Sequence, residues 1–123
     1  MLKATGNTNT STGLQANFVR VLYTTSGGGT ISVQTTTNTG GTYTTAGTTL
    51  TGFGGFASGD TITAMVDATG VVSVWRTRAG TVTLIGTRTL PNVALWTTGG
   101  GRIGIQLPGG GARVDDFAGG TVP

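Results

Sequence analysis

The 123-residue sequence predicts an all-β domain built as an antiparallel sandwich of two sheets. Three observations carry this prediction. Short runs that alternate apolar and hydroxyl-bearing residues recur about every 8–12 residues, the rhythm of a sandwich or barrel. Glycine, with 24 residues, separates these runs, and threonine is commoner still, a composition that favours strands and tight turns. Helix formers are scarce, and no helical period of apolar residues competes with the alternation.

The second expected strand, residues 15–24, has the strongest pattern. Phe18 and Leu22 point to one face of it, and Val19 and Val21 point to the other, because side chains alternate along a strand. A run of three glycines then turns the chain into the next strand, so the pair predicts a hairpin. The expected strands, in chain order, are 2–5, 15–24, 30–37, 43–50, 60–67, 71–77, 81–89, 102–107 and 112–117.

The segments between these strands are expected to be turns and loops. Residues 6–13 are rich in Thr and Asn, residues 52–59 are rich in Gly, and residues 91–96 have no regular pattern. One domain is expected over residues 1–117, because a chain of this length suits a single core. Residues 118–123 are expected to form a C-terminal tail or linker.

Charge and hydropathy exclude two classes of partner. The formal net charge is +3, but the cations are scattered along the chain rather than clustered in a basic stripe, so nucleic-acid binding is not expected. No apolar run approaches the ~20 residues of a membrane span, so membrane insertion is not expected. The absence of cysteine excludes disulfides and thiolate chemistry.

The catalytic chemistry open to this sequence is small, and no enzymatic activity is expected. The chain has no His, Glu or Cys, so a Ser-His-Asp triad cannot form. Its acids are Asp60, Asp67, Asp115 and Asp116. The last two are adjacent on an expected strand and should point to opposite faces, whereas the first two should lie about 23 Å apart along another. Neither pair has the spacing of a glycosidase, although pairs formed across strands stay open.

Four aromatic residues are candidates for ligand binding: Trp96, Trp75, Tyr23 and Tyr43. Amphipathic rings of this kind stack on sugars when they lie on a wet sheet face or in a loop. Trp96 precedes a glycine run in an irregular segment, which favours a loop-borne site. For each of the four, burial in the core is the alternative.

The order of several segments resembles the C-terminal half of concanavalin A-like (laminin G-like) jelly-roll domains. The segments are GFASGDTITAMVDATGVVSVWR, then IGTRTLP, then WTTGGGRIGIQLPGGGARVDDFAGGTV. The resemblance covers most of residues 15–121 and implies a jelly-roll sandwich. Complete domains of that family are longer and begin with further strands. The resemblance therefore implies a domain truncated at the N-terminus, a fragment, or a compact variant.

The resemblance also implies a function, because such modules are appended to secreted bacterial proteins and to phage tail or fibre proteins. It predicts a non-catalytic, carbohydrate-binding, lectin-like module of an extracellular or virion-associated protein, with a glycan as partner. The alternative is a structural domain of a virion or surface filament that forms a homo-oligomer or belongs to a larger parent chain. The first residues lack the apolar stretch of a signal peptide, so export is expected through an upstream signal or inside a particle.

Calcium is the one cofactor that the resemblance suggests. Asp115 and Asp116 lie on the closing strand, where they resemble structural Ca²⁺ ligands, and calcium takes carboxylate, carbonyl and hydroxyl oxygens. The alternative is that one of these carboxylates is solvated and the other bonds to Arg113, Arg102 or backbone N–H groups. In that case the domain needs no cofactor.

Overall fold

The computed structural model describes residues 1–9, 14–97, 103–107, 114 and 116–120. Within them the chain is nearly all β and forms two antiparallel sheets, as the sequence predicts. Sheet A runs in the order β1 (Lys3–Thr8), β2 (Gln15–Thr24), β3 (Thr30–Thr36), β4 (Thr44–Thr45). Sheet B runs in the order β5 (Thr61–Val66), β6 (Val71–Arg78), β7 (Thr81–Thr89). In each sheet, strands that follow one another in the sequence are hydrogen-bonded neighbours.

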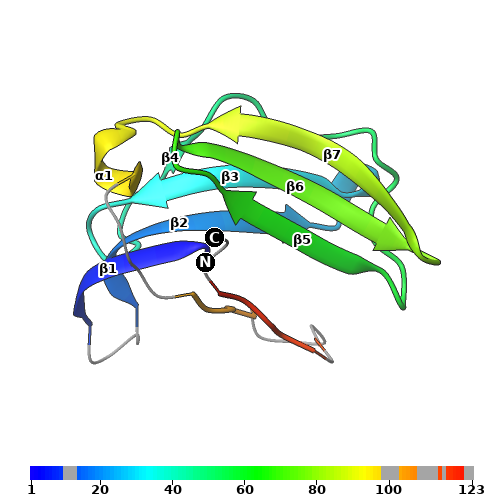
Figure 1. Ribbon diagram of the computed structural model, residues 1–123, viewed down its shortest axis with the longest axis horizontal. Helices are drawn as coiled ribbons and strands as arrows, with labels where there is room; N and C mark the ends of the chain where they lie inside the picture. The colour runs from blue at the N-terminus through cyan, green and yellow to red at the C-terminus, as the bar shows by residue number, and fades with distance from the viewer. Residues whose placement is uncertain (10–13, 98–102, 108–113, 115, 121–123) are drawn as a thin grey trace.

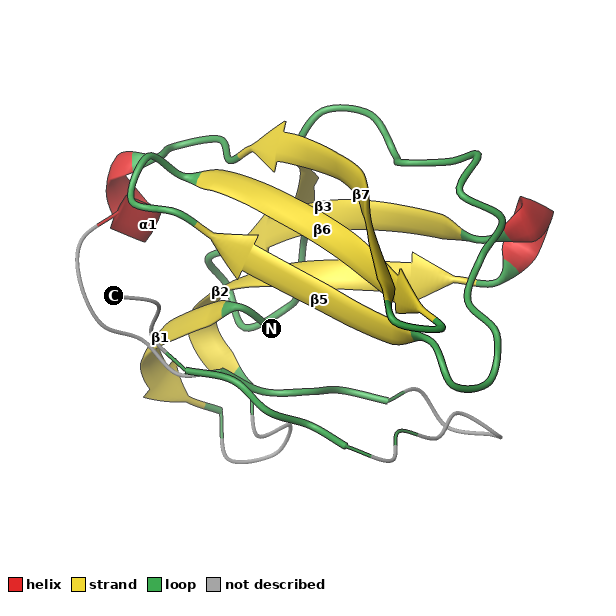
Figure 2. Cartoon of the chain, turned by 45° about the vertical axis from the view of Figure 1, so that its right-hand side comes forward, coloured by secondary structure: helices red, strands yellow, loops and turns green. Residues whose placement is uncertain are grey.

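The two sheets lie one in front of the other and share a core (Figures 1 and 2). Sheet A contributes Val19, Ile31 and Val33, and sheet B contributes Val72 and Val74, each no more than 1% exposed. Burying a side chain of this size is worth about 1.5–3 kcal/mol, so these five residues hold the sheets together. Residues from the connecting segments close the ends of the core: Ala46, Leu50, Leu90 and Trp96.

The turns of sheet B follow from local chemistry. Ala79 and Gly80 both have positive φ, 48° and 80°, which is the type I′ geometry that suits the twist of a two-residue hairpin. At the other end, the Asp67 carboxylate accepts hydrogen bonds from the backbone N–H groups of Thr69 and Val71 and from the Thr69 hydroxyl. These bonds lower the pKa of Asp67, and the bond from the Thr69 hydroxyl has the largest effect.

Two expected boundaries in sheet A are wrong. The first strand continues to Thr8 through the expected loop 6–13, because its pairing with β2 shifts register after Thr5 and accommodates Gly6 at φ +88°. The expected strand 43–50 is reduced to β4 and one isolated bridge between Leu50 and Ile31. Gly47, at φ +65°, takes the chain out of the extended conformation between these two pairings.

The last part of the chain also differs from expectation. The expected strand 102–107 is not formed over 103–107, and residues 114, 116 and 117 of the expected strand 112–117 are not in a strand either. The remaining residues of these two segments lie outside the described part of the chain. Gly104 and Met1 do exchange two backbone hydrogen bonds, of 2.6 and 3.2 Å, but a single such pair does not make a ladder.

The segment expected to be irregular contains a short helix, α1 (Ala94–Thr97). It is closed by backbone bonds from Trp96 and Thr97 to the carbonyl of Val93. A second short helical turn, η1 (Ser26–Gly28), joins β2 to β3. Within the described ranges, no helix is both long and apolar enough for a membrane span.

Candidate functional site

The outer face of sheet B presents Trp75 at its centre. Trp75 lies on β6, the middle strand of sheet B. Val72 and Val74 of the same strand are fully buried in the core, so their face of the strand is the inner one. Trp75 follows Val74 directly and therefore points to the outer face. Across the strands, Trp75 pairs with Thr63 of β5 and with Leu84 of β7. Cross-strand partners share a face, so the partly buried indole is flanked by a hydroxyl on one side and an aliphatic side chain on the other.

A bulge places Leu84 beside the indole. The pairing of β6 with β7 shifts between Val74 and Trp75, so that Ile85 is an extra residue on β7. Ile85 packs against the core, whereas Leu84 is turned outward and is 53% exposed. Bulges re-aim side chains in this way next to binding sites.

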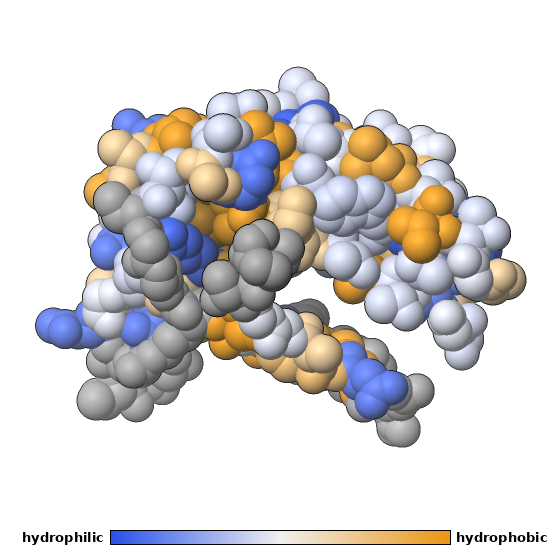
Figure 3. Space-filling model, viewed as in Figure 1, coloured by the Kyte–Doolittle hydropathy of each residue, from blue (hydrophilic) through white to orange (hydrophobic). Residues whose placement is uncertain are grey.

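The face around Trp75 is uncharged and rich in hydroxyl groups. The other residues that the register places on it are Thr61, Thr63, Met65, Val71, Ser73, Thr77, Val82, Leu84, Thr87 and Thr89. Sheet B lies in front in Figure 3, where the surface is mostly pale, with separate apolar patches. The accessible part of the Trp75 ring, set among hydroxyls, offers both stacking and hydrogen bonding to a neutral, hydroxylated ligand.

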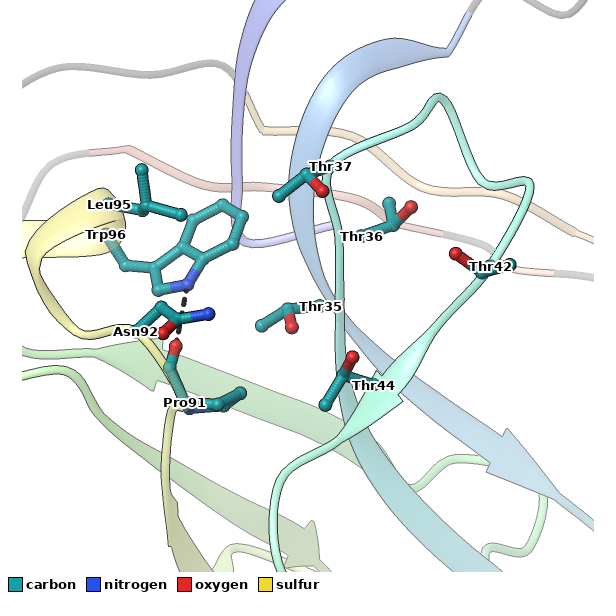
Figure 4. A pocket seen from close by; sticks show the side chains of 9 residues that line it. All are labelled: Thr35, Thr36, Thr37, Thr42, Thr44, Pro91, Asn92, Leu95 and Trp96. Atoms are coloured by element: carbon teal, nitrogen blue, oxygen red, sulfur yellow. Dashed lines mark hydrogen bonds between the residues drawn. The ribbon is translucent and has the colours of Figure 1, made fainter.

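Trp96 has a different environment. It is only 3% exposed, and its indole N–H donates to the carbonyl of Pro91 at 3.1 Å. Lys3 donates to the carbonyl of Trp96. The ring nevertheless forms one wall of a small cavity of about 90 Å³ (Figure 4). The rest of that wall is uncharged: Thr35, Thr36, Thr37, Thr42, Thr44, Pro91, Asn92 and Leu95.

The two tyrosines lie at separate places in the fold. Tyr23 packs on the core side of sheet A, where its ring meets Phe56 at 4.9 Å between centroids and its hydroxyl accepts a bond from the backbone N–H of Phe56. Tyr43 lies over the other side of sheet A. The guanidinium of Arg20 sits 3.4 Å from the centroid of its ring, and Phe18 meets the ring edge-on. The four candidate aromatic residues therefore do not form one site.

The aspartates expected as calcium ligands are not placed together by the described residues. Asp116 is exposed, and Asp115 lies outside the described part. Among the described residues, no group of three or more acidic, His or Cys side chains is gathered. Calcium binding at Asp115 and Asp116 stays a prediction.

A second cavity, which the sequence analysis did not find, lies between the loop that follows Leu50 and the edge strand β7. Its volume is about 360 Å³. Its lining residues are Thr51, Gly52, Phe53, Arg76, Thr83, Leu84 and Ile85. No local signal marks these residues in the sequence, because three separate segments contribute them and only the register of β6 against β7 brings Arg76 opposite Thr83.

Comparison with known proteins adds no relative to this picture. A scan of protein-family models and searches of curated proteins and solved structures found no match to this chain.

Proposed function

We propose that this chain is a non-catalytic, lectin-like carbohydrate-binding module of an extracellular or phage appendage protein. The observation that carries the proposal is Trp75, which stands at the centre of an uncharged, threonine-rich sheet face rather than in the core. Thr63 and Leu84 flank it across the strands.

The chemistry of this face suits a sugar. A pyranose ring has an apolar C–H face, which stacks on an indole, and a rim of hydroxyl groups, which exchange hydrogen bonds with Ser and Thr. Ser73 and Thr77 lie two residues to either side of Trp75 on the same strand and the same face. Hydroxyl groups therefore lie on both sides of the stacking position, along the direction in which an extended glycan would run over β6.

The finer architecture, a concanavalin A-like jelly roll, is part of the same proposal. Two antiparallel sheets with a common core support it, and so does the reciprocal pairing of Gly104 with Met1, which sets the C-terminal segment beside the N-terminus (Figure 1). Jelly rolls need such pairing between segments distant in sequence, because their Greek keys bring the end of the chain back beside its beginning.

A binding experiment on Trp75 tests the proposed function. We expect a glycan array to identify at least one bound polysaccharide, and titration to change the fluorescence of Trp75. Trp75→Ala should weaken binding by about ten- to a hundredfold, the usual cost of removing an aromatic anchor, and Trp75→Phe should weaken it less because a ring remains.

The control is Phe117→Ala, which removes an exposed aromatic ring that the register does not place on this face and should leave the affinity unchanged. The proposal is wrong if no polysaccharide gives a response, or if Trp75→Ala binds as tightly as the wild type.

The second candidate is a purely structural or oligomerising domain of a virion or surface filament. It is favoured by the edge strand β7, whose Val82 and Leu84 are 65% and 53% exposed. An edge strand with apolar side chains and unpaired backbone groups can join a second chain.

A further inference from the structure

Arg76 is held in the fold by backbone carbonyl oxygens, with no ion-pair partner among the described residues. It follows Trp75 on β6 and therefore points to the opposite, inward face. Its Nη1 donates to the carbonyl oxygens of Phe53 and Gly55, at 2.6 and 2.9 Å. Its Nε is buried and has no hydrogen-bond partner among the described residues.

The neighbouring Arg78 shows what a satisfied guanidinium looks like in this fold. Its Nε and Nη2 both donate to the carboxylate of Asp60, with Nη2 and Oδ2 2.5 Å apart. No ion pair joins Arg76 to an acid in the described part of the chain, although the attraction between Arg76 and Asp60 at longer range helps to lower the pKa of Asp60. A guanidinium has five N–H donors and is always charged, so Arg76, whose described acceptors are carbonyl oxygens, keeps an unsatisfied Nε–H and has no directly paired carboxylate among the described residues.

Arg76 also lines the cavity of about 360 Å³ beside β7, and among the described residues it is the only charged one in that lining. Phe53 and Ile85 supply apolar walls, and Thr51 and Thr83 supply hydroxyl groups. The cavity thus combines a cation that has no directly paired carboxylate in the described part of the chain, an aromatic ring and two hydroxyls. This is the set of groups that would receive a small ring carrying an acidic substituent.

We propose that this cavity binds an oxyanion, a carboxylate or a sulfate ester, carried by a sugar ring, so that the chain recognises acidic glycans. The oxyanion is inferred from Arg76 alone, and its attachment to a sugar rests on the proposed function. The site lies at the edge strand β7, and Leu84 belongs both to its lining and to the outer face that carries Trp75.

The most informative variant is Thr83→Asp. Thr83 is the cross-strand partner of Arg76 and lines the same cavity, so an aspartate there supplies an internal counter-ion and occupies the site of the oxyanion. We expect it to weaken binding of an acidic oligosaccharide at least tenfold without lowering the melting temperature. Arg76→Gln should weaken binding as well, but it also removes the bonds to Phe53 and Gly55, so a loss there alone would not separate binding from folding.

The probes are a galacturonic acid trisaccharide, a sulfated galactan oligosaccharide and a neutral galactan trisaccharide, compared by titration calorimetry at low and high salt. We expect at least one acidic probe to bind more tightly than the neutral one, with an affinity that falls as salt rises. The acidic probe that binds identifies the oxyanion. The control Ala94→Asp makes the same change of net charge at an exposed position beyond the far end of β7 and should leave binding unchanged.

The inference is overturned if neither acidic probe binds, if the neutral probe binds equally well, or if Thr83→Asp binds the acidic probe like the wild type. These outcomes are distinct from failure of the proposed function. If a neutral glycan binds through Trp75, the proposed function stands. If Thr83→Asp then binds the acidic probe as tightly as the wild type, only the proposed oxyanion site is rejected.

Discussion

The carboxylate of Asp60 ties the start of β5 to the end of β6. It accepts hydrogen bonds from the guanidinium of Arg78 and from the backbone N–H of Ala57. These bonds lower the pKa of Asp60 from 3.8 to about 2. The bond from Arg78 has the largest effect, and the bond from Ala57 has the next largest. The native state therefore favours the ionised carboxylate, and the unfolded chain takes up a proton first as the pH falls.

We expect this pair to make stability depend on acid pH. Its contribution is fully present above the ordinary pKa of 3.8 and is lost as the pH falls towards about 2. Asp60→Asn should flatten the fall of the melting temperature in that window, and part of the slope should remain because the pKa of Asp67 is lowered too. Thermal unfolding followed by circular dichroism across this pH range measures the effect.

Arg78→Gln provides the matched control, because Arg78 is the main partner of the carboxylate. It should flatten the profile in the same way, and the double variant should add little to either single change. A full acid slope in Arg78→Gln would contradict this assignment.

The two tryptophans show how far the candidate site could be predicted from residues alone. Alternation along residues 71–77 places Trp75 on the same face as Ser73 and Thr77, but it does not say whether that face is wet. Only the packing of Val72 and Val74 against sheet A decides it. The irregular segment makes Trp96 a candidate for a loop-borne site, with burial as the alternative. The structure buries it on α1, where one carbonyl acceptor satisfies its single polar atom.

At the scale of elements, the β2–β3 hairpin touches the loop before β5 through two glycines. Gly29 has φ +93°, and a Cβ there would lie 2.6 Å from the Cα of Gly55. The backbones approach closely at this point, beside the ring of Tyr23. This contact fixes the position of the loop whose carbonyl oxygens, at Phe53 and Gly55, hold Arg76.

We expect Gly29→Ala to destabilise the protein by more than Gly27→Ala. Both residues have positive φ, but Gly27 (φ 62°, ψ 30°) is in the left-handed region, where alanine costs about 1–2 kcal/mol, whereas Gly29 (φ 93°, ψ 130°) lies outside that region. A Cβ on Gly27 meets nothing within 4 Å, so the difference between the two variants in chemical denaturation reports the backbone conformation of Gly29 together with the close approach. Equal losses of stability would show that the hairpin does not press on the loop.

Strands were predicted well where alternation and turn chemistry agree. Residues 15–24 and 81–89 are both strands with the expected bounds: a glycine-rich turn follows the first, and the turn at Ala79 and Gly80 precedes the second. The prediction failed for residues 43–50. The threonines there suit a strand, but the positive φ of Gly47 takes the chain out of the extended conformation after β4. β-propensity describes a fit to a pleated surface and cannot show whether a partner strand is present to complete the ladder.

At the scale of the whole molecule, β5 and β7 are the edge strands of sheet B within the part of the chain that the structure describes. The structural alternative predicts that copies of the chain join through such an edge. In that case light scattering should show a mass that rises with concentration, and Val82→Lys should return the chain to a monomer, because an exposed lysine on an edge strand opposes edge-to-edge pairing.

Leu95→Lys is the control for that experiment, since Leu95 is also exposed but lies on α1 rather than on a sheet edge. A monomer at high concentration in the wild type would rule out the oligomerising alternative and leave carbohydrate binding as the function to test.

The sequence by itself determined the all-β class, the antiparallel hairpins and the two faces of each well-patterned strand. These properties depend on local alternation and on glycine turns, which neighbouring residues encode. Tertiary structure alone decided which face of β6 is wet and that Arg76 meets Thr83 across the strands and Phe53 from a distant loop. Such meetings depend on the register and packing of segments far apart in the chain, and no single segment carries that information.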